Sequence, residues 1–573
     1  KNCRLLLLTA TPMKNLADDI ISLINFLRPP TDPIIRDKIF TVEKNYTMKI
    51  KPGGEEYLRE KVNGYISYFR GNIPYTFAER VDMGKIPKEL LFTPVVKCMM
   101  QPFQLKVYTK AAKDYDDALD RAASSAANFA VTIMNNEKNK IVGSYSSDGI
   151  NKLLSQLNSD RNVLLNLINK ELFKNKIPKS ELNNFIIETP RKTFGGNILK
   201  LKNLKIFSAK FHRAITEIND LIYGKRGAGT AFVYCNLVRA GGIELFAESL
   251  NSNGYFEWNE DRDYDLNDDS RDSLTGMTLK EFKKKGNSIS DFNPSTYILV
   301  TSGSEEGDDL PEVKQKIIRT IFNSTDNRYG KNIKLILGSK VMNEGVTLEN
   351  VKDVHILDVH YNLAKVEQVI GRAIRFCRHM AVTNENNPFP KVNVYRYVVG
   401  LKKGLSSDEI LYQKAEKKYI LVKRVERILK ESAIDCPLLL HGNKFPEEIE
   451  KYKNCVPPTF ENKKKGKTIC PALCDFEKCE IKCYGDILNK NFYDSKNRTY
   501  KEIKPKDLDY STFNDNLAKY EINKVIDMIK DLYRFKSVYI YDEILRKIKK
   551  SYKNKKDELF DNFFLDKALE ELM

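Results

Sequence analysis

Short apolar runs alternate with helical patterns between residues 206 and 400, and no other feature of the chain restricts its fold as much. Four of these runs have the length of strands and are mostly apolar, as strands buried on both faces are. Strands that alternate with helices form a parallel sheet with right-handed crossovers. The sequence therefore predicts an α/β domain with helices on both faces of a parallel sheet. The expected strands are 231–235, 297–301, 333–337 and 354–357, and the expected helices are 208–222, 241–250, 313–323 and 363–376.

One polar pattern, Gln368-Val-Ile-Gly-Arg-Ala-Ile-Arg375, falls on the helix expected at 363–376. Arg372 and Arg375 are three residues apart, so on a helix they project from one face. A guanidinium at such a place can stabilise the charge that builds up on a γ-phosphoryl group. An amphipathic helix with solvated arginines would carry the same pattern, and this alternative stays open.

A glycine-bearing loop between the last two expected strands, residues 338–347, is a second candidate for phosphate chemistry. Its glycines permit a close backbone approach, and the hydroxyls of Ser339 and Thr347 can donate to phosphate oxygens. Glu344 can accept a hydrogen bond from a ribose or from an arginine. An ordinary loop with a glycine turn is the alternative interpretation.

The first residues of the chain predict part of another α/β unit. Residues 4–8 form an apolar run that is typical of a fully buried strand, and the polar turn Thr9-Ala-Thr-Pro12 follows it. A helix is expected over 16–26, and Pro29-Pro30 stops it. A polar turn at the carboxyl end of a buried strand is where α/β sheets place ligand chemistry.

No convincing nucleotide-binding loop accompanies these patterns. Residues 224–230 are glycine-rich but lack the lysine of G-x-x-x-x-G-K-[ST], and they precede an expected strand. Residues 538–543 look like a strand that ends in Asp-Glu, as a Mg²⁺-binding box would, but they come after all the other patterns in the sequence. The chain begins at Lys1 on an apolar run, so we expect it to be part of a longer protein and inactive alone. An inactive variant is the alternative.

Three of these patterns occur in the order found in superfamily 2 helicases. Thr9-Ala-Thr-Pro12 resembles motif III, residues 338–347 resemble motif V, and Gln368–Arg375 resembles motif VI. Together with further matches, they resemble the SNF2-like helicases of large nucleocytoplasmic DNA viruses, a group that includes a poxvirus nucleoside triphosphatase and a poxvirus early transcription factor. The further matches are residues 71–77, 208–211, 232–236, 241–243, 343–348 and 358–362.

The resemblance implies two RecA-like lobes that bind ATP and Mg²⁺ between them and couple DNA-dependent ATP hydrolysis to viral transcription. It also implies a role for each matching residue. Arg375 would be the arginine finger, Arg372 a second contact to the γ-phosphate, and Gln368 a residue that orders the site. The other implied roles are nucleotide binding for Gly345, Glu344 and Gly371, coupling of the lobes for Thr9 and Thr11, and nucleic-acid binding for Ser339, Thr347 and Ser302.

The expected partners are nucleic acid, DNA rather than RNA, and viral RNA polymerase or transcription-factor subunits. The net charge of +18 favours a polyanionic partner, although the Lys- and Asn-rich composition of AT-biased coding would give a similar balance. The alternative function is a non-catalytic transcription-factor subunit that uses a helicase scaffold to bind promoter DNA or polymerase.

The expected location is the host cytoplasm, in viral factories, and the virion, as the resemblance implies. The sequence contains no apolar run of 18 residues and no recognisable signal peptide, so we expect neither a membrane span nor secretion.

Six of the ten cysteines lie between residues 436 and 483. Without a secretory signal, this cluster suggests reduced thiols or metal ligands rather than disulfides. Free buried thiols are one interpretation, because buried cysteine is common. The other is a structural Zn²⁺ with the ligands Cys470, Cys474, Cys479 and Cys483.

The sequence divides into five predicted parts. In the last part, a short apolar run at 538–541 among three helices suggests a winged helix, and a plain helical bundle is the alternative. The parts are 1–90 (end of a first RecA-like lobe and connector), 91–114 with 206–400 (second RecA-like lobe), 115–205 (helical insertion without strong strand signals), 401–500 (linker helix and Cys-rich segment) and 501–573 (helical module).

Overall fold

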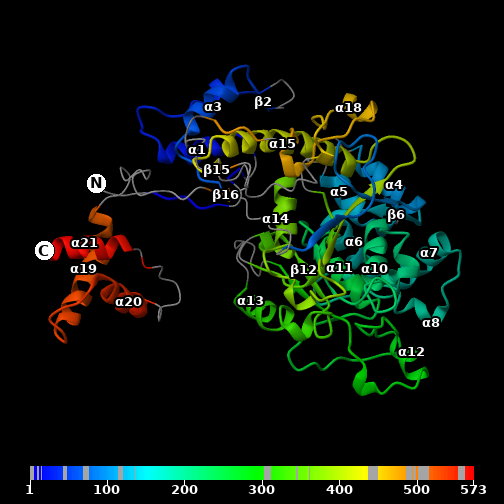
Figure 1. The fold of residues 1–573 in the computed structure, drawn as a ribbon. Helices are drawn as coiled ribbons and strands as arrows, with labels where there is room; N and C mark the ends of the chain where they lie inside the picture. Colours follow the sequence, from blue (N-terminus) through cyan, green and yellow to red (C-terminus); the bar gives the residue numbers. More distant parts are fainter. Residues whose placement is uncertain are drawn as a thin grey trace. The chain divides into compact units, whose positions relative to one another are not determined.

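A computed structural model of the chain contains two compact units, Lys1–Ile487 and Leu488–Met573, which are described here one at a time (Figure 1). The structure describes residues 5–9, 12–13, 16–42, 48–68, 77–113, 121–135, 137–301, 311–343, 346–359, 362–436, 450–479, 481–484, 493–494, 499–500, 515–552, 560 and 562–573.

The first unit is built on an eight-stranded sheet whose strand pairs are all parallel. The strand order is β10-β11-β12-β9-β13-β14-β3, and the long strand β14 pairs with β3 along its first part and with β4 along its second. The bounds are Glu79–Asp82 (β3), Val96–Met99 (β4), Thr230–Tyr234 (β9), Phe256–Glu257 (β10), Thr296–Val300 (β11), Leu335–Gly338 (β12), Val351–Ile356 (β13) and Lys391–Gly400 (β14).

Side chains of the central strands alternate between two apolar cores, one on each face of this sheet. In β9, Ala231 and Val233 enter the first core, whereas Phe232 and Tyr234 enter the second. The first core also contains side chains of α10 (Ala209–Asn219) and α11 (Ile243–Asn251), and the second contains those of α14 (Leu363–Ala373). Both faces are therefore covered, which confirms the predicted α/β class.

The segment predicted as a helical insertion contains two antiparallel hairpins, so the expectation of helices alone is wrong. Four successive residues of β5, from Val131 to Met134, are buried, so its sequence shows no alternation. The segment joins the first core of the sheet domain instead of building a separate one. Its elements are α5 (Arg121–Asn128), β5 (Val131–Asn135), β6 (Lys140–Ser144), α6 (Ser146–Ser159), α7 (Arg161–Phe173), α8 (Lys179–Leu182), β7 (Ile187–Glu188) and β8 (Phe194–Gly195).

The apolar run at residues 4–8 is not a buried strand in the part of the chain that the structure describes. Leu6 is 80% exposed and Leu8 is 86% exposed. A strand that is apolar on both sides needs neighbouring strands and covering layers, and no described strand pairs with this run. The predicted buried strand at residues 4–8 is wrong for that reason. The helix expected over 16–26 is present as α1 (Asp19–Leu27).

The helix α15 (Ser407–Glu431) connects the sheet to the first residues of the unit (Figure 1). Near its start, Tyr412 packs in a cluster with Val398 of β14. Near its end, Val425 packs in another cluster with Ile24 of α1 and Leu58 of α3 (Gly54–Val62). One helix therefore contributes to two separate apolar clusters.

Three helices lie in the described residues of the second unit: α19 (Asp515–Tyr533), α20 (Tyr541–Tyr552) and α21 (Asn562–Leu572). Their apolar side chains form one small core. Residues 538–540 are irregular and Tyr541 begins α20, so the predicted strand at 538–541 is wrong. The described residues of this unit therefore form a three-helix arrangement, with a two-stranded hairpin of β15 (Tyr493–Asp494) and β16 (Thr499–Tyr500).

The remaining elements are short connections in the first unit. Among the described residues, no helix is long and apolar enough to cross a membrane. The bounds are Arg36–Ile39 (α2), Phe40–Val42 (β1), Met48–Ile50 (β2), Pro102–Ala111 (α4), Leu201–Leu204 (α9), Leu279–Lys284 (α12), Glu312–Ile317 (α13) and Phe460–Lys464 (α18).

Glu416 of α15 provides a test of this fold. Its fully buried carboxylate accepts hydrogen bonds from the N–H groups of Leu91, Phe92 and Thr93, at 2.7, 3.0 and 2.8 Å. Glu416→Ala leaves these donors without their acceptor, so we expect the free energy of unfolding to fall by about 3 kcal/mol. Urea denaturation followed by circular dichroism measures this loss. The exposed Lys417→Ala on the same helix is the control, and equal midpoints for the two variants would contradict the role of Glu416.

Candidate active site

The helix α14 carries most of the Gln368–Arg375 pattern at the border of the second core. Its N-terminus is capped by the side chain of Asn362, which accepts a hydrogen bond from the Ala364 N–H at 2.9 Å. The apolar stripe of the helix is buried against the sheet. This packing leaves Gln368 and Arg372 half-buried on the opposite side.

The two arginines of the pattern do not share a helical face. The helix ends at Ala373, because Ile374 adopts an extended backbone (φ −108°, ψ 92°). Arg375 therefore lies beyond the helix, and the prediction that it pairs with Arg372 through helical spacing is wrong.

Both guanidinium groups contact the loop of residues 346–348 instead. Arg372 Nη1 lies 3.5 Å from the carbonyl oxygen of Val346. Arg375 Nη1 donates to the hydroxyl of Thr347. The end of the segment resembling motif V and the segment resembling motif VI are therefore in direct contact.

Arg375 differs from nearby arginines in its electrostatic partners. Among the described residues it forms no ion pair, whereas Arg378 pairs with Glu349 at 2.8 Å and Arg396 pairs with Asp82 at 2.7 Å. The side chain of Arg375 is half-buried and is oriented by a neutral hydroxyl. A guanidinium without a carboxylate partner is suited to bind the oxygens of a phosphate.

Asn323, which was not identified from the sequence, holds this loop in position. Its side-chain nitrogen donates to the carbonyl oxygen of Thr347 at 2.9 Å, and its oxygen accepts from the Glu349 N–H at 2.9 Å. A lone asparagine at a helix end carries no sequence signal for this role. The loop is therefore braced on one side by Asn323 and on the other by Arg372 and Arg375.

The other predicted site residues are not gathered around the arginines in the same manner. Ser339 is buried at the carboxyl end of β12, with its hydroxyl 3.5 Å from the Val300 carbonyl oxygen. Thr9 is exposed. The space beside Gly371 is open, since a Cβ added there would meet no atom within 4 Å. The roles of Ser339, Thr9 and Gly371 stay predictions. Glu344, Gly345, Thr11 and Ser302 lie outside the described residues.

A network of charges fixes α14 against the edge of the sheet. Glu367, next to Gln368, accepts hydrogen bonds from Arg80 of β3 at 3.0 Å and from Arg396 of β14 at 3.3 Å. Both arginines also bond to Asp82. Burial is the largest single influence and would raise the pKa of Glu367, but attraction and hydrogen bonding to Arg80, together with attraction to Arg396 and Lys423, outweigh it and lower this pKa to about 2. Sequence reasoning missed the network because its members lie far apart along the chain.

The depressed pKa of Glu367 predicts a pH-dependent contribution to stability. The contribution is complete above the ordinary glutamate pKa of about 4.3, and it is lost as the pH falls through that value towards the folded pKa of about 2. Because the side chain is 30% exposed, we expect Glu367→Gln to cost about 1–2 kcal/mol at pH 7 and much less near pH 2.5. Urea unfolding at both pH values measures the difference. The exposed Glu385→Gln is the control, and a pH-independent cost for Glu367→Gln would contradict the ion pair.

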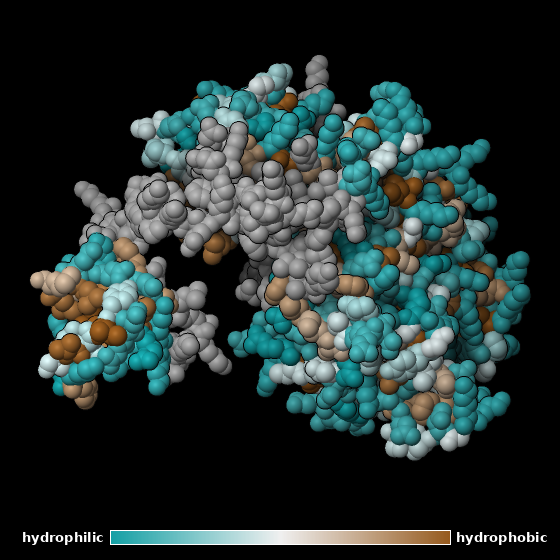
Figure 2. Space-filling view, in the orientation of Figure 1, coloured by the Kyte–Doolittle hydropathy of each residue, from teal (hydrophilic) through white to brown (hydrophobic). Residues whose placement is uncertain are grey.

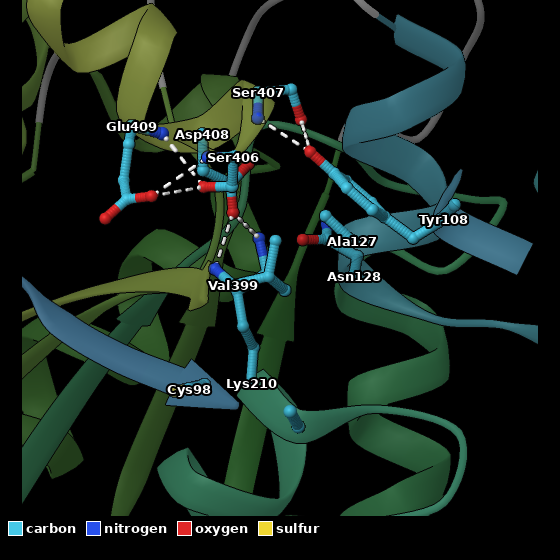
Figure 3. Close-up of polar contacts among 12 residues, drawn as sticks. Cys98, Tyr108, Ala127, Asn128, Lys210, Val399, Ser406, Ser407, Asp408 and Glu409 are labelled. Carbon is cyan, nitrogen blue, oxygen red and sulfur yellow. Dashed lines mark hydrogen bonds and ion pairs between the residues drawn. The ribbon is translucent and has the colours of Figure 1, made fainter. Parts of the chain in front are cut away.

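The matching pattern at residues 208–211 has a structural role that needs no ligand. Lys210 of α10 and Asp408 of α15 form an ion pair at 3.2 Å, and each side chain is 1% exposed. The Asp408 carboxylate also accepts from the Val399 N–H at 3.0 Å, so it links the end of β14 to α10 (Figure 3). Ser208 caps α10 by accepting from the Phe211 N–H at 3.1 Å. Breaking a buried pair of this kind is strongly destabilising, which is enough to explain these residue types.

Neither candidate for a phosphate-binding loop has the required geometry. Residues 224–229 lead into β9, so they precede a strand instead of following one, as predicted. Gly466-Lys-Thr468 carries the last three residues of G-x-x-x-x-G-K-[ST], a match that the sequence reasoning did not consider. Glu461 stands where the first glycine is required, and α18 comes before Gly466 rather than after Thr468.

The clustered cysteines form disulfide bonds, so the predictions of a zinc site and of free thiols are wrong. The candidate zinc ligands are divided among three different bonds and cannot share one ion. Within the described ranges, no group of His, Cys, Asp and Glu side chains could hold a metal ion. The bonds are Cys436–Cys483, Cys455–Cys470 and Cys474–Cys479.

Thiol titration tests this pairing. All ten cysteines should react after reduction and denaturation, whereas the six disulfide-bonded cysteines should not react in protein that is denatured without reductant. Metal analysis of the same sample should find less than one equivalent of zinc. Ten reactive thiols together with stoichiometric zinc would contradict the disulfides.

The strands β12 and β13, the braced loop and α14 all lie within one segment that is similar to a known protein family. A family model described as the helicase conserved C-terminal domain matches residues 306–377, which include β12, β13, α14 and Arg375. The match covers the contact between the two predicted motifs.

Proteins of large DNA viruses are similar to the chain over most of its length. A "Putative ATP-dependent RNA helicase" of Acanthamoeba polyphaga mimivirus is 46% identical over 588 residues, which cover 100% of this chain and 50% of that protein. A "Putative helicase" of Invertebrate iridescent virus 3 is 24% identical, with 85% of this chain and 39% of that protein covered. An "Early transcription factor large subunit homolog" of African swine fever virus is 24% identical, with 75% and 37% covered.

The chain spans about half the length of the first of these relatives and less of the other two. Among solved structures, the C-terminal part of the Fun30 ATPase domain is similar at a TM-score of 0.29 and 14% identity, covering 62% of this chain and 98% of that one. A score of that size supports no structural conclusion.

Proposed function

We propose that the chain supplies the second RecA-like lobe of an SNF2-like, ATP-dependent motor that moves along nucleic acid, DNA in preference, during viral transcription. One observation carries this proposal. Arg375 is held at the loop of residues 346–348 by a neutral hydroxyl, is half-buried, and forms no ion pair among the described residues. Its charge is therefore available to a phosphate oxygen in a site where its neighbours are neutralised.

The arrangement around Arg375 fits a nucleotide that approaches from outside this lobe. Arg372 contacts the same loop, and Gly371 leaves the adjoining surface of α14 open. The network of Glu367, Arg80 and Arg396 holds α14 in a fixed orientation, which is what electrostatic stabilisation of a phosphoryl group requires. ATP with Mg²⁺ would supply the phosphoryl chemistry, and the phosphate loop and Mg²⁺ carboxylates would come from other residues of a longer protein.

The second candidate function is a non-catalytic transcription-factor subunit that binds promoter DNA or RNA polymerase on a helicase scaffold. The similarity to the early transcription factor subunit homolog of African swine fever virus favours it. The longer coding sequence distinguishes the two candidate functions. The presence of G-x-x-x-x-G-K-[ST] and an Asp-Glu box would favour the motor, and their absence from an intact gene would favour the non-catalytic subunit. For either function, the viral relatives suggest the cytoplasm of infected cells as the location, and packaging in the virion is part of the proposal.

Arg375→Ala in a protein that contains both lobes tests the motor. We expect the rate of nucleic-acid-stimulated ATP hydrolysis to fall by about a thousandfold, because an arginine finger is worth roughly 10³–10⁵ in kcat. Affinity for nucleic acid should change little. Phosphate release and fluorescence anisotropy measure the two quantities.

Arg378→Ala is the matched control, since Arg378 lies in the same turn but is exposed and paired with Glu349. It should retain most of the activity. Wild-type turnover by Arg375→Ala would contradict its assigned role, and rapid ATP hydrolysis by residues 1–573 alone would show that the nucleotide site lies elsewhere.

A further inference from the structure

The connection between α19 and α20, residues 533–541, exposes apolar side chains to an unusual degree and is called the tip below. Phe535 is 86% exposed, Val538 70% and Ile540 68%. None of these side chains contributes to the core of the second unit. Adjacent exposed apolar side chains on a soluble domain mark a binding surface more often than scattered ones do.

The tip is an ordered structure because Tyr539 holds it. The Tyr539 hydroxyl donates to the Leu532 carbonyl oxygen at 2.7 Å, and its ring lies 5.3 Å from that of Tyr533. The ammonium groups of Lys536 and Lys547 each lie 5.0 Å from the centre of the Tyr539 ring. The turn that carries Phe535 is therefore held in place before any ligand binds, so its backbone loses little conformational entropy on binding.

Positive charge surrounds the tip. Residues 530–550 contain seven Lys and Arg residues but only three Asp and Glu residues. Arg534, beside Phe535, has a side chain 78% exposed, and its pairing with Asp531 is a surface contact that a phosphate can replace at little cost. The exposed side of α20 adds further cations, and Figure 2 shows apolar residues of this unit surrounded by hydrophilic ones. These cations are Arg546, Lys547, Lys549 and Lys550.

From these features we propose that the tip is a binding site for single-stranded nucleic acid, separate from the motor domain. Phe535 would stack on a base, since every base offers a π-face and stacking tolerates any sequence. Arg534 and the cations of α20 would contact the phosphates. Charge favours this ligand over an apolar protein segment, because a net excess of four positive charges is complementary to a polyanion. Binding at the tip does not depend on ATP hydrolysis, so this proposal can be tested separately from the proposed motor function.

Photocrosslinking of the full chain with a single-stranded oligonucleotide that contains iodouridine tests the site. We expect crosslinks within residues 533–541, and Phe535→Ala should weaken binding of the oligonucleotide about tenfold in anisotropy titrations. Phe535→Trp should restore binding, because an indole also stacks. Arg534→Ala should reduce the slope of log affinity against log salt by about 1, whereas Phe535→Ala should leave that slope unchanged.

Leu572→Ala is the matched control, since Leu572 is an exposed apolar residue of the same unit and lies on α21. It should bind like wild type, and circular dichroism should show that all variants are folded. Crosslinks confined to residues 1–487, or equal affinity for Phe535→Ala and Leu572→Ala, would overturn the proposal. Loss of a protein partner by Phe535→Ala without loss of oligonucleotide affinity would overturn it too.

Discussion

The parallel sheet has to be buried on both faces, and the rest of the first unit follows from that requirement. Parallel strands cannot be joined by tight hairpins, so each connection crosses a face and covers it. The alternation of Ala231, Phe232, Val233 and Tyr234 in β9 fills two cores at once. The connections that cover those cores also carry the candidate site, because α14 is both a covering helix and the carrier of Arg372.

Long-range charges orient the covering helices on the two cores. Glu367 holds α14 to β3 and β14, Asp408 holds α15 to α10, and Glu416 holds α15 to the connector before β4. Each is a carboxylate with several partners, and burial of a charge is tolerated only under that condition. The proposed site benefits from this arrangement, since a cation that stabilises a developing charge must be placed before the reaction begins.

The cation proposed to act on phosphate, Arg375, forms no ion pair with any residue that the structure describes. Arg80, Arg396 and Arg378 are neutralised by Glu367, Asp82 and Glu349, whereas Arg375 contacts a hydroxyl. At the tip, Arg534 does pair with a carboxylate, that of Asp531, but both side chains are exposed, so a phosphate can replace this partner at little cost.

Elements that depend on local pattern could be predicted closely. The strands β9, β11, β12 and β13 and the helices α10, α11 and α14 each lie within a few residues of their expected positions. Predictions failed where distant partners decide the outcome. The run at 4–8 lacks the strands that would bury it, the hairpin of β5 and β6 is stabilised by the core of the sheet domain, and Cys470 bonds to Cys455 instead of a metal.

The sequence by itself determined the parallel α/β class, the order of the motifs and the identity of the candidate phosphate-binding arginines, because hydrophobic periodicity and motif spacing are local properties of the chain. Only the tertiary structure decided how those arginines meet. Arg375 leaves the helix and reaches Thr347, and Glu367 finds Arg80 across 287 residues. Such contacts depend on where the folded backbone passes, which no local pattern of residues specifies.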